Sequence, residues 1–87
     1  MNLKEVVGIN LKYYRYKTGL SQEKFYTNLG LNPKYLASVE RGRENISIDY
    51  IEDLAVKLGV STYDLVTYHE DRVIRKKRID EKVHVNS

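Results

Sequence analysis

The chain has 87 residues, which is enough for one small domain with a modest core. It contains no cysteine, which excludes disulfide bonds and thiolate metal sites, and no apolar run of about eighteen residues that would span a membrane. The first residues lack the long apolar stretch and the cleavage site of a signal peptide, so we expect the protein in the cytoplasm.

The formal net charge of +3 is unevenly distributed along the chain. Residues 1–45 carry eight basic and four acidic side chains, a net charge of +4, whereas residues 46–87 carry seven and eight, a net charge of −1. A basic half suits a polyanionic partner such as a nucleic acid, although a charge this small is also typical of an ordinary solvated surface.

The first predicted helix covers about residues 3–17. Its apolar residues do not form one clean stripe, but Val7, Leu11 and Tyr14 lie at helical spacing. Gly19 follows as a natural C-terminal cap, because glycine adopts the left-handed conformation without a Cβ clash. We therefore expect the helix to end just before this glycine.

The next segment, residues 21–42, predicts two short helices joined by a tight turn. Ser21 is a good N-cap for the first helix, and Gly30 ends it. Asn32 caps the second helix, and Pro33 fills its first position, where the missing N–H does no harm. The apolar residues that should face the core are Phe25, Leu29, Leu31, Leu36 and Val39.

Two further helices are predicted in the second half of the chain. Ser47 caps a helix over about residues 48–58, and Ser61 or Thr62 caps a short helix over about residues 63–68. The longer helix has a clear apolar stripe, formed by Ile51, Leu54, Ala55 and Leu58. No segment up to this point alternates as a strand does, so we predict an all-α domain.

We place the helical domain at residues 1–68 and a charged C-terminal tail at residues 69–87. The tail could extend the last helix, add a strand to a partner or stay disordered, and we expect disorder or partial order of its last ten residues. Its basic residues are Arg72, Arg75, Lys76, Lys77 and Arg78. We expect this run to be solvated or to face a dimer partner rather than DNA.

The chain resembles the Cro/C1-type (XRE-like) helix-turn-helix family of phage repressors and their bacterial relatives over about residues 9–66, with the motif at 22–41. The residues that carry the resemblance are Gln22, Phe25, Leu29, Gly30, Leu31, Leu36, Val39, Glu40, Arg41 and Gly42, followed by Ile48, Ile51, Leu54, Ala55, Leu58, Gly59 and Val60. It implies a compact five-helix, lambda-repressor-like domain that binds duplex DNA, usually as a dimer, to control transcription. The small size and the loop at residues 43–45 also resemble restriction–modification controller proteins, and small phage-type repressors and some antitoxins look similar.

The resemblance implies that the second helix of the motif, about residues 33–41, enters the major groove with its N-terminal residues leading. Lys34 can donate to guanine and Ser38 can donate or accept, whereas Gln22 and Arg43 are expected on the phosphate backbone. The predicted DNA-binding residues are Gln22, Asn32, Pro33, Lys34, Tyr35, Ser38, Arg41, Arg43 and Asn45.

Ordinary structural roles would also explain several of these residues. Capping alone explains Asn32, packing explains Tyr35, and a surface ion pair with Glu44 or Glu40 would explain Arg43. The site assignment is therefore a hypothesis for the structure to examine.

Two positions of the motif concern packing rather than DNA. Arg15 and Glu40 match a family ion pair between the first helix and the recognition helix, and we expect a partly buried salt bridge rather than two exposed charges. Tyr26 departs from the family pattern, which usually has a small residue there because the two helices approach closely. We predict that its ring lies over the edge of the helices and that its hydroxyl points to water.

The sequence contains little that is typical of an enzyme. His69 and His84 have no cysteine or carboxylate at ligand spacing, no glycine-rich phosphate loop is present, and no nucleophile–base set can be drawn. We therefore expect no catalysis, no metal and no cofactor.

The predicted function is sequence-specific binding of double-stranded DNA by a transcriptional regulator, a repressor or autoregulator that acts as a homodimer on a near-palindromic operator. Tyr63 and Tyr68 lie where family members often dimerise. The alternative is an antitoxin or other protein-interaction module whose tail binds a partner protein.

Overall fold

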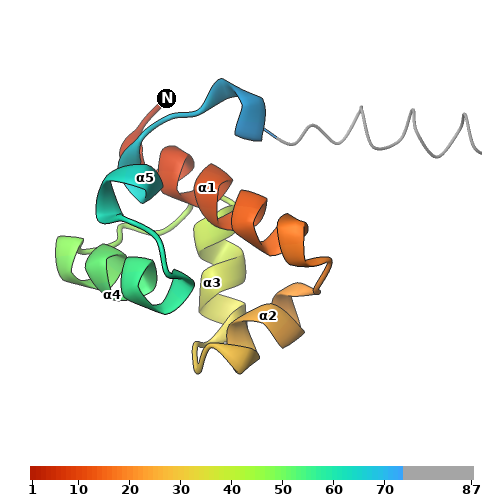
Figure 1. Ribbon diagram of the computed structural model, residues 1–87. Coiled ribbons are helices and arrows are strands. Elements are labelled where there is room, and N and C mark those ends of the chain that lie inside the picture. Colours follow the sequence, from red (N-terminus) through yellow and green to blue (C-terminus); the bar gives the residue numbers. More distant parts are fainter. Residues whose placement is uncertain (74–87) are drawn as a thin grey trace, which may run out of the picture.

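The computed structural model describes residues 1–73, which form one helical domain (Figure 1). The elements are α1 (Leu3–Thr18), α2 (Gln22–Asn28), α3 (Pro33–Glu40), α4 (Ile48–Leu58), α5 (Thr62–Val66) and the 3₁₀ helix η1 (Glu70–Arg72). These residues contain no strand, so the all-α, five-helix prediction is confirmed. None of these helices is long and apolar enough to cross a membrane. The predictions for residues 74–87 lie outside the described part of the chain.

Side-chain caps start the helices at the places that the sequence predicts. The caps of α2 to α5 are Ser21, Asn32, Ser47 and Ser61. Of the two candidates for α5, Ser61 is the cap, because its hydroxyl accepts the N–H of Asp64 at 3.0 Å. This helix ends at Val66, two residues before the predicted end. At α1 the cap is Asn2, in a reciprocal capping box with Glu5 that the sequence analysis did not identify.

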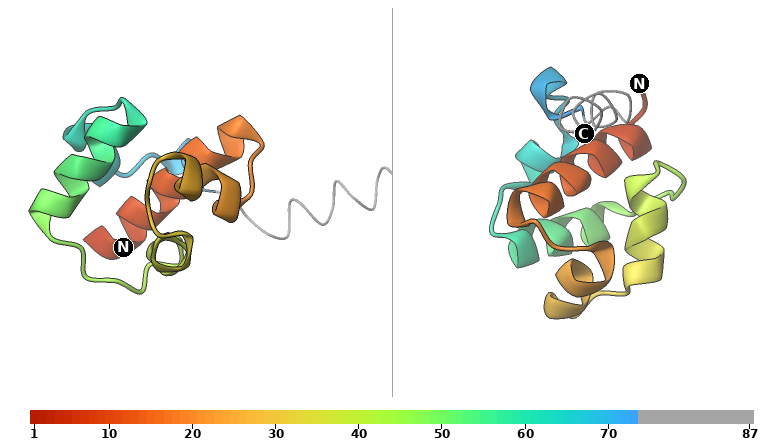
Figure 2. Two further views of the ribbon diagram at one scale, coloured as in Figure 1. Left: turned by 90° about the horizontal axis from the view of Figure 1, so that it is seen from below. Right: turned by 90° about the vertical axis from the view of Figure 1, so that its right-hand side faces the viewer.

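The core lies where α1 crosses the other helices. Helix α1 packs against α2, α3 and α5, and α4 packs against α5 (Figures 1 and 2). The core residues are Val7, Leu11, Phe25, Tyr26, Leu36, Val39, Ile51, Leu54, Ala55 and Leu65. This set contains most of the faces that helical spacing predicts for α1, α3 and α4, while the predicted Tyr14 and Leu58 are half-buried and pack against it.

A glycine in α1 allows α3 to approach closely. Gly8 is buried, and a Cβ atom built on it would lie 2.6 Å from the carbonyl oxygen of Val39 and 2.8 Å from that of Glu40. Both neighbours are backbone atoms at the end of α3, so a larger residue would push the two helices apart. Gly8 therefore fixes the distance between α1 and α3.

The prediction for Tyr26 is wrong. Its side chain has no exposed surface, and its hydroxyl donates to Glu40 Oε2 at 2.5 Å instead of pointing to water. The ring also packs edge-on against Phe25, with 5.1 Å between the ring centroids. A buried carboxylate needs hydrogen-bond donors, and the inward tyrosine supplies one, so a large residue occupies a position that is usually small.

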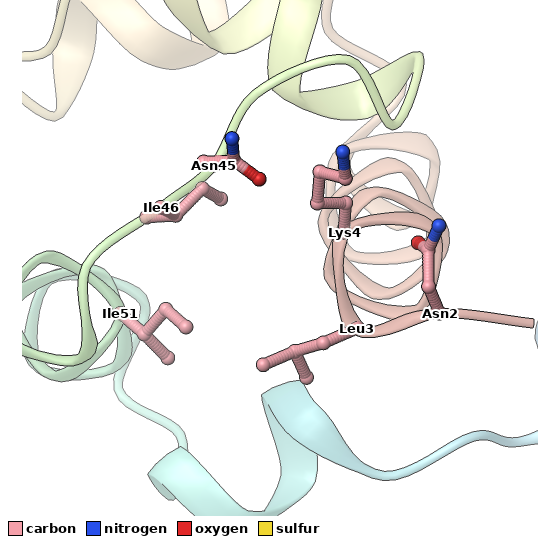
Figure 3. Close-up of a pocket in the computed structure, with 6 residues that line it drawn as sticks. All are labelled: Asn2, Leu3, Lys4, Asn45, Ile46 and Ile51. Carbon is pink, nitrogen blue, oxygen red and sulfur yellow. The ribbon is translucent and has the colours of Figure 1, made fainter.

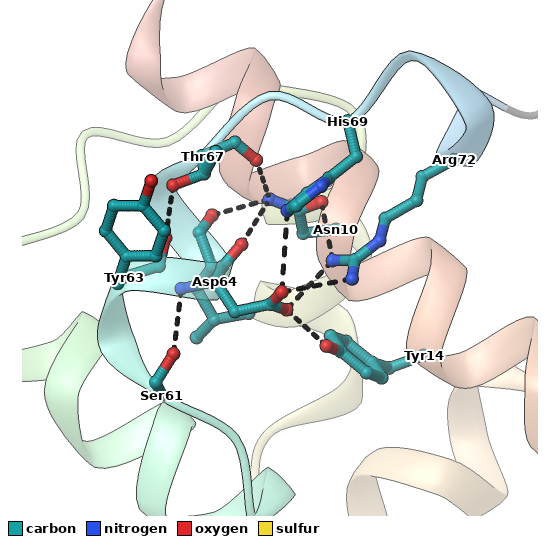
Figure 4. A network of polar contacts seen from close by, with 9 residues as sticks. Asn10, Tyr14, Ser61, Tyr63, Asp64, Thr67, His69 and Arg72 are labelled. Carbon is teal, nitrogen blue, oxygen red and sulfur yellow. Dashed lines mark hydrogen bonds and ion pairs between the residues drawn. The ribbon is translucent and has the colours of Figure 1, made fainter.

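For Arg72, the prediction of a solvated side chain is wrong. Its guanidinium forms two hydrogen bonds with the Asp64 carboxylate, at 2.8 and 3.0 Å (Figure 4). It also lies 4.4 Å from the centroid of the Tyr13 ring. The Tyr14 hydroxyl donates to the same carboxylate. Because these partners satisfy and cover the charge, the side chain is only 12% exposed.

Asn10 completes this group, which we call the latch cluster (Asn10, Tyr14, Asp64 and Arg72). It is fully buried in α1, and its side-chain amide donates to the carbonyl oxygens of Asp64, Leu65 and Thr67 at 2.8–3.1 Å (Figure 4). These carbonyl oxygens lie at the end of α5, and the last carbonyl groups of a helix have no N–H donors within the helix. The latch cluster therefore ties α1, α5 and η1 together.

Candidate nucleic-acid interface

The turn between α2 and α3 has the geometry that the sequence predicts. Gly30 has φ +74°, and the N–H groups of Gly30 and Leu31 donate to the carbonyl oxygens of Thr27 and Tyr26 at 3.0 and 2.8 Å. This is the Schellman pattern of hydrogen bonds that closes a helix at a left-handed glycine. Asn32 then starts α3 by accepting the N–H groups of Lys34 and Tyr35.

The outer face of α3 borders a shallow hollow of about 400 Å³. We call it the recognition hollow. The residues that line it are Asn32, Lys34, Tyr35, Ser38, Arg41 and Glu44. Lys34 and Arg41 are exposed, while Leu36 and Val39 on the opposite face of the helix are buried. The structure thus brings five of the predicted DNA-binding residues to one surface.

The other predicted residues lie around this surface or away from it. Pro33 is half-buried at the first position of α3, and Arg43 is exposed just after the helix. The alternative role of Arg43, an ion pair with Glu44 or Glu40, is not formed. Within residues 1–73, no carboxylate lies within salt-bridge distance of Arg43. Asn45 lines a different pocket, of about 260 Å³, between the start of α1 and α4 (Figure 3).

Arg15 and Glu40 form the predicted ion pair. Arg15 Nε lies 2.8 Å from Glu40 Oε2, and Nη2 lies 2.9 Å from Oε1. The side chains are 12% and 1% exposed, so the pair is largely buried. Arg15 also donates to the carbonyl oxygen of Leu20 at 3.2 Å, which fixes the turn before α2.

Two more donors reach the same carboxylate, and we call the four residues the Glu40 cluster (Arg15, Gln22, Tyr26 and Glu40). Gln22 Nε2 donates to Oε1 at 3.0 Å and the Tyr26 hydroxyl donates to Oε2, so each oxygen accepts two hydrogen bonds. Burial raises the pKa of Glu40, but the hydrogen bonds from Arg15, Tyr26 and Gln22 outweigh it and hold the pKa below the usual 4.5. The cluster ties α1 and α2 to the end of α3.

The structure adds to this surface one acidic residue, Glu44, which the sequence analysis did not select as a site residue. Glu44 lines the recognition hollow and accepts the Ser38 hydroxyl at 2.7 Å. Gly42, two residues after the end of α3, has φ +71° and turns the chain back toward this helix. A search for polar residues just beyond that glycine would have found Glu44.

Two short helices joined by a tight turn, the second of which presents lysine, arginine and serine side chains, define a helix-turn-helix protein. The family profile described as helix-turn-helix matches residues 11–65, and the chain belongs to this family. The resemblance that the sequence analysis identifies is therefore confirmed.

Curated relatives support the same assignment. The chain is 40% identical over 67 residues to an HTH-type transcriptional regulator, y4dJ, of Sinorhizobium fredii, covering 77% of this chain and 87% of that protein. It is 34% identical to control protein C.BamHI of Bacillus amyloliquefaciens, covering 77% and 84% of the two chains.

A solved structure supports the fold. The crystal structure of a hypothetical transcription factor from Neisseria superposes with a TM-score of 0.70, at 37% identity and over 82% of each chain. The family and these relatives are transcription regulators and not enzymes, as the sequence analysis predicts. The chain is a DNA-binding helix-turn-helix transcription regulator.

Proposed function

We propose that the protein binds a near-palindromic operator in double-stranded DNA as a homodimer and represses a neighbouring gene or its own. The observation that carries this proposal is the recognition hollow, which collects Lys34, Ser38 and Arg41 on the outer face of α3. A helix fits the major groove of B-DNA, where each base pair presents a distinct pattern of donors and acceptors.

The packing of α3 supports base reading, because a reading helix must be held in one orientation. The Glu40 cluster fixes the end of α3 through a buried carboxylate with four hydrogen bonds. At Gly8, the same end of α3 packs so closely against α1 that there is no room for a Cβ atom. Hydrogen-bonded and packed contacts of this kind hold side chains within the tolerance that base recognition needs.

Individual contacts can be assigned by chemistry. Lys34 donates to guanine O6 or N7, and Asn32 keeps its amide hydrogens for a base or a phosphate because only its oxygen serves as the cap. Arg41 and Arg43 are exposed and suit phosphates. Gln22 gives one amide hydrogen to Glu40 and keeps the other for the phosphate backbone.

Exposed apolar side chains support the homodimer. Val56 is 80% exposed on α4, Tyr63 is 75% exposed on α5, and Tyr68 is 47% exposed just beyond it. A second copy that covered these residues would remove apolar surface from water. In such a dimer the two recognition helices enter successive major grooves, about 34 Å apart.

The test is selection of the preferred site from random duplexes, followed by fluorescence anisotropy with the selected and a scrambled duplex across a salt series. We expect the selected duplex to bind at least about a hundredfold more tightly, within the range of specific over non-specific binding. A dimer with six to eight phosphate contacts should give a log–log salt slope of about −5 to −7.

Three variants separate the roles of the residues. Lys34→Ala should weaken the selected duplex much more than the scrambled one, whereas Arg43→Ala should weaken both and reduce the salt slope by about one per half-site. Lys57→Ala, an equal loss of charge on the exposed face of α4, is the control. Equal and weak binding of all duplexes would contradict the proposal and direct the search to a protein partner of the tail.

A further inference from the structure

The chain leaves the recognition helix through a turn that brings it back over the same helix. The N–H of Gly42 donates to the carbonyl oxygen of Val39 at 2.9 Å, and the N–H of Arg43 donates to that of Ser38 at 3.2 Å. Together with φ +71° at Gly42, these bonds form a second Schellman motif. The next residue, Glu44, is therefore placed beside the outer face of α3 by backbone hydrogen bonds.

Glu44 is held at that position by the recognition helix itself. Its Oε2 atom accepts the Ser38 hydroxyl at 2.7 Å, and both side chains line the recognition hollow. Both residues are half-buried. The bond engages one oxygen of the carboxylate, and Oε1 accepts no hydrogen bond from the described residues.

The charge of this carboxylate is unusual for its surroundings. Glu44 is the one acidic residue among the residues that line the hollow, and no lysine or arginine of residues 1–73 lies within ion-pair distance of it. On a surface that faces DNA, an unpaired carboxylate near phosphates is repelled. It is favourable only opposite a hydrogen-bond donor of a base.

In the major groove, such donors are the amino groups of cytosine N4 and adenine N6, and glutamate characteristically accepts from cytosine N4. We propose, resting on the proposed function, that Glu44 is a specificity-determining residue that accepts a hydrogen bond from cytosine N4 at one position of each half-site. Ser38 is then a positioning residue for the carboxylate. A thymine at that position presents O4, an acceptor, and is rejected.

The experiment begins with site selection from random duplexes by the wild-type protein and by Glu44→Gln. The wild-type motif should contain one cytosine per half-site whose replacement by thymine lowers affinity about tenfold or more. Glu44→Gln should lose this preference and shift it toward adenine, which glutamine contacts through N6 and N7. Glu52→Gln, an equal change of charge on the exposed face of α4, should select the wild-type motif.

A chemical substitution in the DNA then isolates the donor. Replacing that cytosine by 2-pyrimidinone, which lacks the amino group, should weaken the wild-type protein about as much as thymine does and leave the affinity of Glu44→Gln nearly unchanged. A purely structural role for Glu44 would not produce this difference. Ser38→Ala should keep the preference for cytosine but reduce it, because the carboxylate is still present and less well held.

The outcomes distinguish this inference from the proposed function. A wild-type protein that selects no motif contradicts both. A clear wild-type motif that Glu44→Gln reproduces unchanged, or one that tolerates 2-pyrimidinone, contradicts the cytosine contact alone. An equal rise in affinity for every duplex on removing Glu44 would show that the carboxylate acts only by repelling phosphates.

Discussion

Tyr26 donates its hydroxyl hydrogen to Glu40 Oε2 at 2.5 Å, from a side chain with no exposed surface. Burial and the neighbouring carboxylate raise the pKa of the Tyr26 phenol, so it remains a donor at any physiological pH. The hydroxyl is one of four hydrogen-bond donations to Glu40, and its loss would leave that carboxylate under-satisfied.

Tyr26→Phe should therefore destabilise the protein although it keeps the ring in the core. Hydrogen bonds to charged groups are worth about 1.5–3 kcal/mol, and we expect a loss of that order in the free energy of unfolding. Urea denaturation at neutral pH measures it. Tyr16→Phe is the matched control, since that residue is 46% exposed and lies outside the proposed dimer surface, and it should change stability by less than about 0.5 kcal/mol.

Glu40→Gln tests the ion pair as a whole. Removing one partner leaves the Arg15 guanidinium, which is 12% exposed, without its counter-charge, and breaking such a pair costs about 3–5 kcal/mol. The same neutralisation at Glu52, on the exposed face of α4, should have little effect on the melting temperature. If the Glu40→Gln and Glu52→Gln variants have the same melting temperature, the ion pair of Arg15 and Glu40 contributes nothing measurable to stability.

The residues that the sequence predicted well are those whose structural reason is local. Ser21, Asn32 and Ser47 cap helices through residues two or three positions away, and Gly30 needs only its own backbone conformation. The ion pair of Arg15 and Glu40 was predicted from family resemblance, which carries long-range information that spacing does not.

The predictions that failed depend on contacts between distant parts of the chain. Arg72 is covered by Tyr13 and Asp64, and no periodic pattern records that the residues after α5 return to α1. Tyr26 was expected outside because a small residue is usual there, but the space and the hydrogen-bond acceptor that receive it lie at the end of α3. Asn10 was missed because a buried polar residue interrupts an apolar pattern without showing what it bonds.

Gly8→Ala should destabilise the protein, against the usual direction of this change in a helix. Alanine is better than glycine in a helix by about 1 kcal/mol, but the added Cβ would lie 2.6 Å from the Val39 carbonyl oxygen. Relieving an overpacked contact of this kind costs about 1–3 kcal/mol, and backbone atoms yield less than side-chain ends. Thermal denaturation should show a lower melting temperature; a higher one would mean that α1 and α3 separate freely.

The latch cluster should show strong coupling between Asp64 and Arg72. Their two hydrogen bonds, at 2.8 and 3.0 Å, join side chains that are 23% and 12% exposed. In a double-mutant cycle of Asp64→Asn and Arg72→Ala, we expect a coupling energy of about 1–3 kcal/mol by urea denaturation. The exposed pair Asp53 and Lys57, four residues apart on α4, should give no more than about 0.5 kcal/mol in the same cycle.

The ion pairs of Glu40 and Asp64 also predict how stability depends on pH. The hydrogen bonds from Arg72 hold the pKa of Asp64 below its usual 3.8, and the Glu40 cluster holds the pKa of Glu40 below 4.5. Each carboxylate therefore has a lower pKa in the folded than in the unfolded state, and the unfolded chain binds more protons at acidic pH. Their contribution to stability is complete above the unfolded pKa values and is lost as the pH falls through the folded ones.

Urea midpoints measured from about pH 6 down to about pH 3 should consequently fall steeply below about pH 4.5 in the wild-type protein. Glu40→Gln and Asp64→Asn should start from lower midpoints and fall less, because each has already lost one carboxylate whose protonation destabilises the fold. Asp53→Asn, which changes an exposed aspartate, should follow the wild-type curve. Parallel curves for all four proteins would mean that neither Glu40 nor Asp64 has a lower pKa in the folded state.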